Sequence, residues 1–90
     1  MLFSDLPFSV LRKLLLDLGF EEKALPASSV VPVPSIAFRD AESDTFFLFR
    51  AYRPQDKVSM ADLVTVRKQL DWRGLLGEET FDTALRKASA

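Results

Sequence analysis

The residues best suited to chemistry lie in one run, residues 45–54, TFFLFRAYRP. Aromatic rings can stack on bases and guanidinium groups can contact phosphates, so this run could form a nucleic-acid platform. The alternative is an ordinary core strand, because aromatic residues are enriched in strands for packing reasons alone. We favour the core strand, with residues 46–49 buried between two covered faces and with Tyr52 keeping its hydroxyl in water at the strand end.

Basic residues of this run and of the next helix could form a phosphate-binding patch. Double-stranded-RNA-binding modules use a basic helix start and a loop in this way. Acidic residues are interspersed among the basic ones, and such mixed charges more often form a solvated face. The patch therefore stays an alternative, and its candidate nucleic-acid-binding residues are Arg50, Arg53, Lys57, Arg67 and Lys68, which Arg12 and Lys13 could join.

Trp72 is the candidate protein-interface residue. On a helical wheel it lies opposite Leu63, away from the apolar stripe of its helix. Tryptophan is enriched among the residues that dominate protein interfaces. The other interpretation, which we favour, is that the last helix folds back and covers Trp72 with Phe81 or Leu85.

The proline-rich residues 28–34, SSVVPVP, offer a second candidate surface. An extended backbone of this kind could accept a partner strand at a sheet edge. Prolines also keep an open edge from pairing, and we favour that interpretation.

Catalysis has few candidate groups in this chain. There is no cysteine and no histidine, which excludes thiol chemistry, zinc sites built on Cys or His, and Ser-His or Cys-His pairs within the chain. The carboxylate pairs Glu21-Glu22 and Glu78-Glu79 are adjacent in sequence, so they point apart in a strand or serve a helix start. We expect no enzyme activity, no catalytic residue, no cofactor and no metal.

The composition favours one globular domain, residues 1–90. The net charge of −1 gives no overall attraction to nucleic acid or to an anionic membrane. The longest apolar run, Leu14-Leu15-Leu16, is too short to span a bilayer, and Asp5 stands where a signal peptide would be basic. We expect a cytoplasmic protein.

Periodicity predicts three helices and three strands. The first helix is expected over about residues 6–18, capped by Ser4 or Asp5. Strands are expected at residues 20–25, 35–39 and 45–53, and the remaining helices from Ser59 to Gly74 and over residues 78–87. The predicted fold class is α+β, a two-layer α-β-β-β-α-α sandwich with a three-stranded antiparallel sheet packed by helices on one face.

The leucine-rich first helix, the following Leu18-Gly19-Phe20 and the later Phe38-Arg39 resemble the HicA toxin family over residues 8–53. The resemblance implies a small bacterial α-β-β-β-α module related to the double-stranded-RNA-binding fold. The family's Gly-Ser-His-His motif would lie just before Phe38, where this chain has Val33-Pro34-Ser35-Ile36. A histidine carries the proton in RNA cleavage by that family, so the resemblance implies a relative that is not a HicA-type nuclease.

Two functions follow as expectations. The first is a non-catalytic interaction domain that binds another protein or a second copy of itself through the surface around Trp72 or through an edge strand. The alternative is a non-enzymatic RNA-binding domain of the double-stranded-RNA-binding type.

Overall fold

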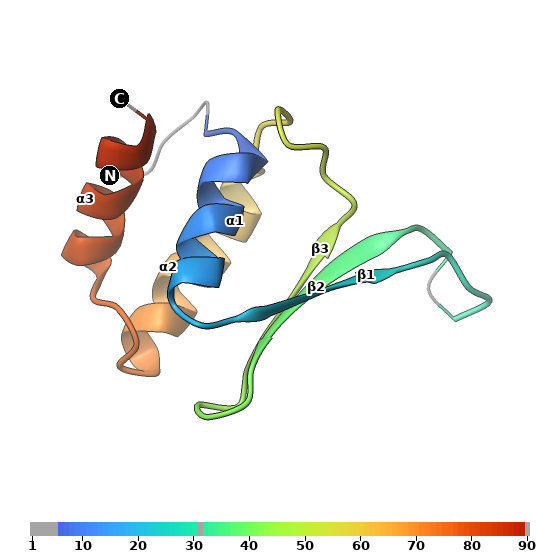
Figure 1. The fold of residues 1–90 in the computed structure, drawn as a ribbon, viewed down its shortest axis with the longest axis horizontal. Coiled ribbons are helices and arrows are strands. Elements are labelled where there is room, and N and C mark those ends of the chain that lie inside the picture. The colour runs from blue at the N-terminus through green and yellow to red at the C-terminus, as the bar shows by residue number, and fades with distance from the viewer. Residues whose placement is uncertain (1–5, 31, 90) are drawn as a thin grey trace.

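A computed structural model describes residues 6–30 and 32–89 of the chain (Figure 1). The order α-β-β-β-α-α and the α+β class are confirmed. The predicted helix caps Ser4 and Asp5 lie outside the described residues. The elements are α1 (Phe8–Asp17), β1 (Glu21–Leu25), β2 (Ser35–Asp40), β3 (Thr45–Arg50), α2 (Met60–Trp72) and α3 (Glu78–Ser89).

The three strands form one antiparallel sheet in the order β1-β2-β3, so β3 is an edge strand. Phe38 in the central strand lies opposite Glu22 on one side and Phe47 on the other. β3 ends at Arg50 and not at residue 53 as predicted. The Tyr52 N–H donates to the Arg50 carbonyl at 2.7 Å, and this tight turn takes the chain out of the sheet.

Helices cover one face of the sheet (Figure 1). α1 and α2 lie next to the strands, and α3 packs against α1 and α2 on their side away from the sheet. The apolar spacing of each helix explains this arrangement, because each buries one stripe and leaves the rest in water. The stripes consist of Phe8, Leu11 and Leu15 in α1, Leu63, Val66 and Leu70 in α2, and Phe81 and Leu85 in α3.

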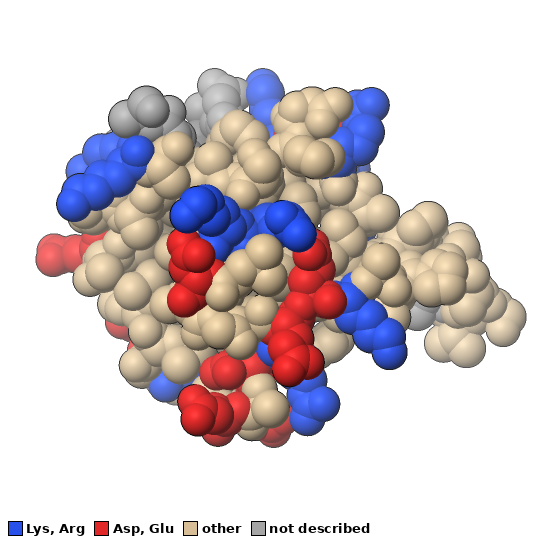
Figure 2. Space-filling model, in the orientation of Figure 1, with Lys and Arg blue, Asp and Glu red and all other residues tan. Residues whose placement is uncertain are grey.

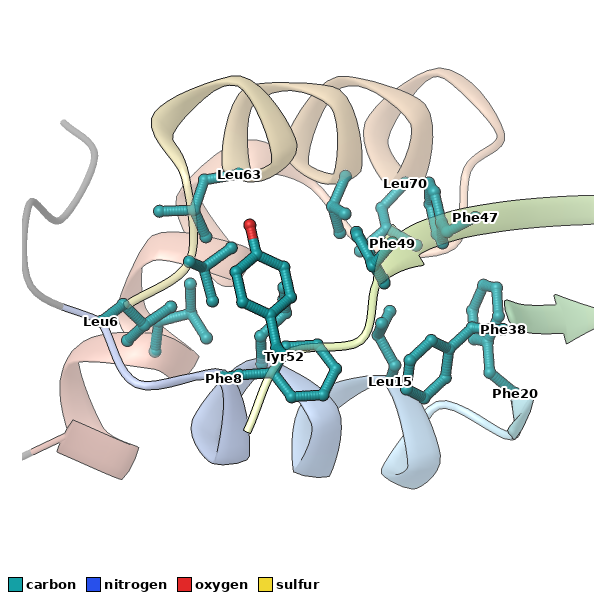
Figure 3. Close-up of a cluster of buried hydrophobic side chains, with 14 of the residues drawn as sticks. Leu6, Phe8, Leu15, Phe20, Phe38, Phe47, Phe49, Tyr52, Leu63 and Leu70 are labelled. Carbon is teal, nitrogen blue, oxygen red and sulfur yellow. The ribbon is translucent and has the colours of Figure 1, made fainter. Parts of the chain in front are cut away.

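Aromatic rings from the sheet and from α1 fill the centre of the core (Figure 3). The Phe8 ring stacks on Tyr52 with 5.0 Å between centroids, and it meets Phe49 edge-on at 6.0 Å. Phe20 stacks on Phe47 at 5.6 Å. Offset and edge-on contacts of this kind are favourable beyond the area they bury, so the rings fix how α1 sits on the sheet.

The start of α1 is held by the loop that follows β3. The Phe8 N–H donates to the Asp56 carbonyl at 2.8 Å, and the Ser9 N–H donates to the Pro54 carbonyl at 2.9 Å. These bonds satisfy N–H groups that a helix start leaves free. The loop therefore has a fixed position beside α1, which sets where its side chains point.

The expectation that the Tyr52 hydroxyl lies in water is wrong. The side chain is buried, and its hydroxyl donates to Asp62 Oδ2 at 2.7 Å and accepts from the Ser59 N–H at 3.0 Å. Ser59 also caps α2, since its Oγ accepts from the Asp62 N–H at 3.2 Å. In a capping box the acidic side chain reaches the cap N–H directly. Here the Tyr52 hydroxyl bridges the two groups at the start of α2.

We predict that Tyr52→Phe lowers the free energy of unfolding by about 1–2 kcal/mol, because it removes two hydrogen bonds and keeps the ring in the core. Urea unfolding of the variant and of the wild type measures this difference. Ser59→Ala is the matched variant at the same cap and is expected to cost about 1 kcal/mol. An unchanged midpoint for Tyr52→Phe would show that the bridge does not stabilise α2.

Candidate interaction surface

The exposed side of β3 corrects the central expectation for residues 46–49. Phe47 and Phe49 are 3% and 4% exposed and belong to the core. Phe46 and Leu48 are 56% and 48% exposed. Side chains alternate between the two faces of a strand, and the helices cover only one face of this sheet. The prediction that both faces are covered is therefore wrong for these two residues.

The open face of the sheet carries apolar and charged side chains in three cross-strand rows. Residues that lie opposite each other in the ladder share a face, so the register defines each row. Two rows have an exposed apolar side chain on β3 and a charged side chain on β1. The rows are Phe46-Arg39-Glu21, Leu48-Ala37-Lys23 and Arg50-Ser35-Leu25.

The backbone of β3 has hydrogen-bonding groups that point away from the sheet. The Ala51 N–H donates to the Pro34 carbonyl at 3.2 Å. This bond shows which residues of β3 are hydrogen-bonded to β2. Because an antiparallel ladder alternates, Phe47 and Phe49 bond to β2, whereas the N–H and C=O groups of Phe46 and Leu48 point outward. Among residues 6–30 and 32–89, none bonds to these outward groups.

The two edges of the sheet differ in character. β1 carries Glu21, Glu22 and Lys23, and charged side chains discourage the pairing of an edge with another chain. The β3 edge has no charge between Thr45 and Phe49. An apolar edge strand with free backbone groups is a template for a further strand, so β3 is the edge that can accept one.

Trp72 is 77% exposed at the end of α2, and α3 does not cover it. The interpretation that Phe81 or Leu85 packs on Trp72 is wrong, because both are buried in the core. Arg73 lies between Trp72 and the sheet: its guanidinium is 5.4 Å from the indole ring and donates to the Ser43 carbonyl at 3.1 Å. Trp72 is thus placed near the turn where β3 begins.

The structure brings together three of the five predicted basic residues. Arg50, Arg53 and Lys57 line one open groove of about 720 Å³ beside Val33 and Pro34. The groove also contains Asp56, whose carboxylate lies 3.1 Å from Arg53 Nη2. The Arg50 guanidinium lies over the Tyr52 ring at 4.7 Å. The groove is therefore basic but partly neutralised.

The remaining predicted basic residues lie elsewhere. Arg67 faces α3, where Nε donates to Asp82 at 3.0 Å and Nη1 donates to Glu78 at 2.9 Å. Lys68 is exposed on the flank of α2 that also carries Trp72. On α1, Arg12 and Lys13 pair with Glu22 and Asp17. Figure 2 shows the same mixture, with Lys and Arg next to Asp and Glu on the visible face.

Two of these ion pairs shift the pKa of a carboxyl group. Hydrogen bonds from Arg67 lower the pKa of Asp82. Hydrogen bonds from the Arg53 backbone N–H, and then from its side chain, lower the pKa of Asp56. Both acids are thus held in their charged form, and Asp82, which is buried, links α3 to α2.

The pH dependence of stability tests the Asp82 contact. A carboxyl whose pKa is lowered by folding stabilises the fold fully above its unfolded pKa, about 3.9, and this contribution is lost as the pH falls through the folded pKa. We predict that Asp82→Asn is less stable than the wild type at pH 7 and that the difference shrinks below about pH 4. Urea unfolding at several pH values measures this, with the exposed Asp17→Asn as control. A difference that is the same at pH 7 and pH 3 would contradict the prediction.

Residues 28–30 and 32–34 lie in a loop and not at a sheet edge. They connect β1 to β2, and the described members have no strand conformation. Val30 and Val33 are exposed, and Val31 lies outside the described residues. The interpretation that the prolines protect a sheet edge is wrong for this reason: the two edges are β1 and β3.

Within the described part of the chain, no group of three acidic residues could hold a metal ion. No helix there has the length and apolar character needed to cross a bilayer. No family model, no curated protein and no solved structure matches the chain.

Proposed function

We propose that this chain is a small non-catalytic protein-interaction domain that binds its partner through β3. The binding surface consists of the outward backbone groups of residues 46 and 48 and of their exposed side chains. The observation that carries the proposal is the exposure of Phe46 and Leu48 on an edge strand with no charged residue between Thr45 and Phe49. Strand addition at such an edge gives main-chain hydrogen bonds, and the alternate side chains give specificity.

Trp72 supports the same surface. It lies near the start of β3 through the contact of Arg73 with Ser43, and it is the most exposed large ring of the described residues. An exposed tryptophan of this kind is a suitable anchor for a partner. The expected interface therefore extends from the β3 edge to the end of α2.

A distant relationship to HicA toxins remains part of the proposal. The segment Leu18-Gly19-Phe20, which carries part of the resemblance, follows α1: Gly19 has a φ of 99°, and Phe20 packs on Phe47. The family's histidine positions are occupied by residues 33–36, and the chain contains no histidine. We propose no nuclease activity, because the chain has no histidine to carry the proton.

Site-specific photo-cross-linking in the native host tests the proposed function. A benzoylphenylalanine at position 48 is expected to form an adduct of discrete mass with a protein, identified by mass spectrometry. The matched control is the same group at exposed Glu79, on α3. Adducts that are equally weak at positions 48 and 79 would overturn the proposal.

RNA binding is the second candidate, and the observation that favours it is the groove lined by Arg50, Arg53 and Lys57. Titration of a short double-stranded RNA at low salt, followed by NMR, tests it. Shifts confined to these residues, with affinity that falls steeply with salt, would support RNA binding. A flat titration would leave protein binding as the function.

A further inference from the structure

We propose that the partner at β3 is a second copy of this chain, and that two β3 strands pair antiparallel with Phe46 of one copy opposite Leu48 of the other. This inference rests on the proposed function, because it uses the same edge. It adds the identity of the partner and the register of the two strands.

The backbone selects this register. Phe46 and Leu48 have an outward N–H and an outward C=O, which a two-fold partner can match in both directions. The same alternation points the Arg50 groups outward, but the Arg50 carbonyl already accepts from the Tyr52 N–H at 2.7 Å. The pairs of Phe46 with Leu48 use residues whose outward N–H and C=O groups have no partner among residues 6–30 and 32–89. Pairing Leu48 with itself would place Phe46 opposite Arg50 and leave one apolar pair on the open face, where the proposed register has two.

The side chains agree with the register. On the open face, Phe46 of each copy meets Leu48 of the other, which gives two apolar cross-strand pairs around the axis. The same register places Arg50 opposite Asp44, an exposed acidic residue in the turn before β3. Its φ of 55° is a conformation that Asp tolerates. The interface is therefore complementary in charge as well as in its backbone donors and acceptors.

The proposed pairing also gives an assembly that stops at two copies. The two copies use both β3 edges, and the extended sheet then ends in β1 on each side. β1 carries Glu21, Glu22 and Lys23, so further strand addition is disfavoured. The expected assembly is a dimer with one continuous six-stranded sheet and not a filament.

α2 packs on the core face of β3. α2 runs along β3, since Asp62 near its start bonds Tyr52 and Arg73 after its end bonds Ser43. Its buried residues face the sheet, so Lys68 and Trp72, on the opposite side of the helix from Leu63, point away from the sheet. A two-fold axis through the middle of β3 therefore brings the α2 helices of both copies to the same face of the extended sheet.

Disulfide trapping tests the register, because the chain has no cysteine and each introduced thiol is unique. Equal amounts of Phe46→Cys and Leu48→Cys protein are mixed and oxidised. Directly opposed residues lie about 5.5 Å apart at Cα, within disulfide range, whereas residues 46 and 46 or 48 and 48 of two copies would be about 8 Å apart. We expect the mixed 46–48 disulfide to exceed the half share that random pairing gives. A random distribution, or a preference for 48–48, would overturn the register.

Sedimentation equilibrium tests the dimer itself. The wild type is expected to associate, and Leu48→Lys is expected to weaken the association by at least about tenfold, since it places a charge opposite Phe46. The matched control is Val30→Lys, at an exposed valine in the β1–β2 loop, which is expected to change nothing. A wild type that stays monomeric at millimolar concentration would overturn self-association. If position 48 then still cross-links another protein, the proposed function stands without it; if it does not, both fail.

Discussion

Phe47→Ala is expected to lower the free energy of unfolding by about 3–5 kcal/mol, whereas Phe46→Ala is expected to change it by less than about 1 kcal/mol. The two phenylalanines are neighbours in sequence, but Phe47 stacks on Phe20 in the core and Phe46 points from the open face into solvent. Removing the Phe47 ring leaves a cavity among packed rings, and removing the Phe46 ring leaves none.

Urea unfolding of dilute, monomeric protein gives both values under the same conditions. The pair is its own control, because each substitution removes the same side chain from the same strand. Equal losses for the two variants would mean that both faces of β3 are covered, and the open face would then not exist.

Phe81→Ala is expected to cost a similar amount, about 3–5 kcal/mol. Phe81 is fully buried although α3 makes no extensive contact with the sheet, so α3 completes the core from behind α1 and α2. The matched control is Thr83→Ala, at an exposed position two residues along α3, which is expected to be within about 0.5 kcal/mol of the wild type.

Urea unfolding with tryptophan fluorescence and circular dichroism follows the Phe81 variant. We expect both signals to move together to a lower midpoint, because α3 belongs to the same cooperative unit as α2. A loss of helix signal before the main transition would show that α3 detaches on its own and contributes little to the core.

The helices could be predicted from the sequence because each apolar stripe repeats at the helical period. The stripe Leu63, Val66 and Leu70 turned Trp72 away from the sheet, but it could not show that α3 leaves Trp72 exposed. The order of the strands was harder to predict, since consecutive strands with short connections pair with their neighbours only as a tendency. The apolar run 46–49 has the composition of a central strand, yet it lies at the edge.

The spacing of residues in β3 indicates the open face, but only once it is known which side chains of the strand share a face. Arg50 is two residues after Leu48 and four after Phe46, so a strand that ends in an exposed arginine exposes these residues as well. The sequence could not show in this way which of the predicted basic residues lie together. The partners of Arg67 lie on α3, and contacts between residues far apart in sequence leave no periodic pattern.

Amide hydrogen exchange of β3, resolved residue by residue by NMR, tests most directly whether its outer edge is free and accepts a second copy. In dilute protein the amides of Phe46 and Leu48 are expected to exchange fast, while those of Phe47 and Phe49, which bond to β2, stay protected. In concentrated protein all four are expected to be protected. Slow exchange of Phe46 and Leu48 at every concentration would mean that the edge is already covered within one chain, and fast exchange at every concentration would mean that no second copy pairs with it.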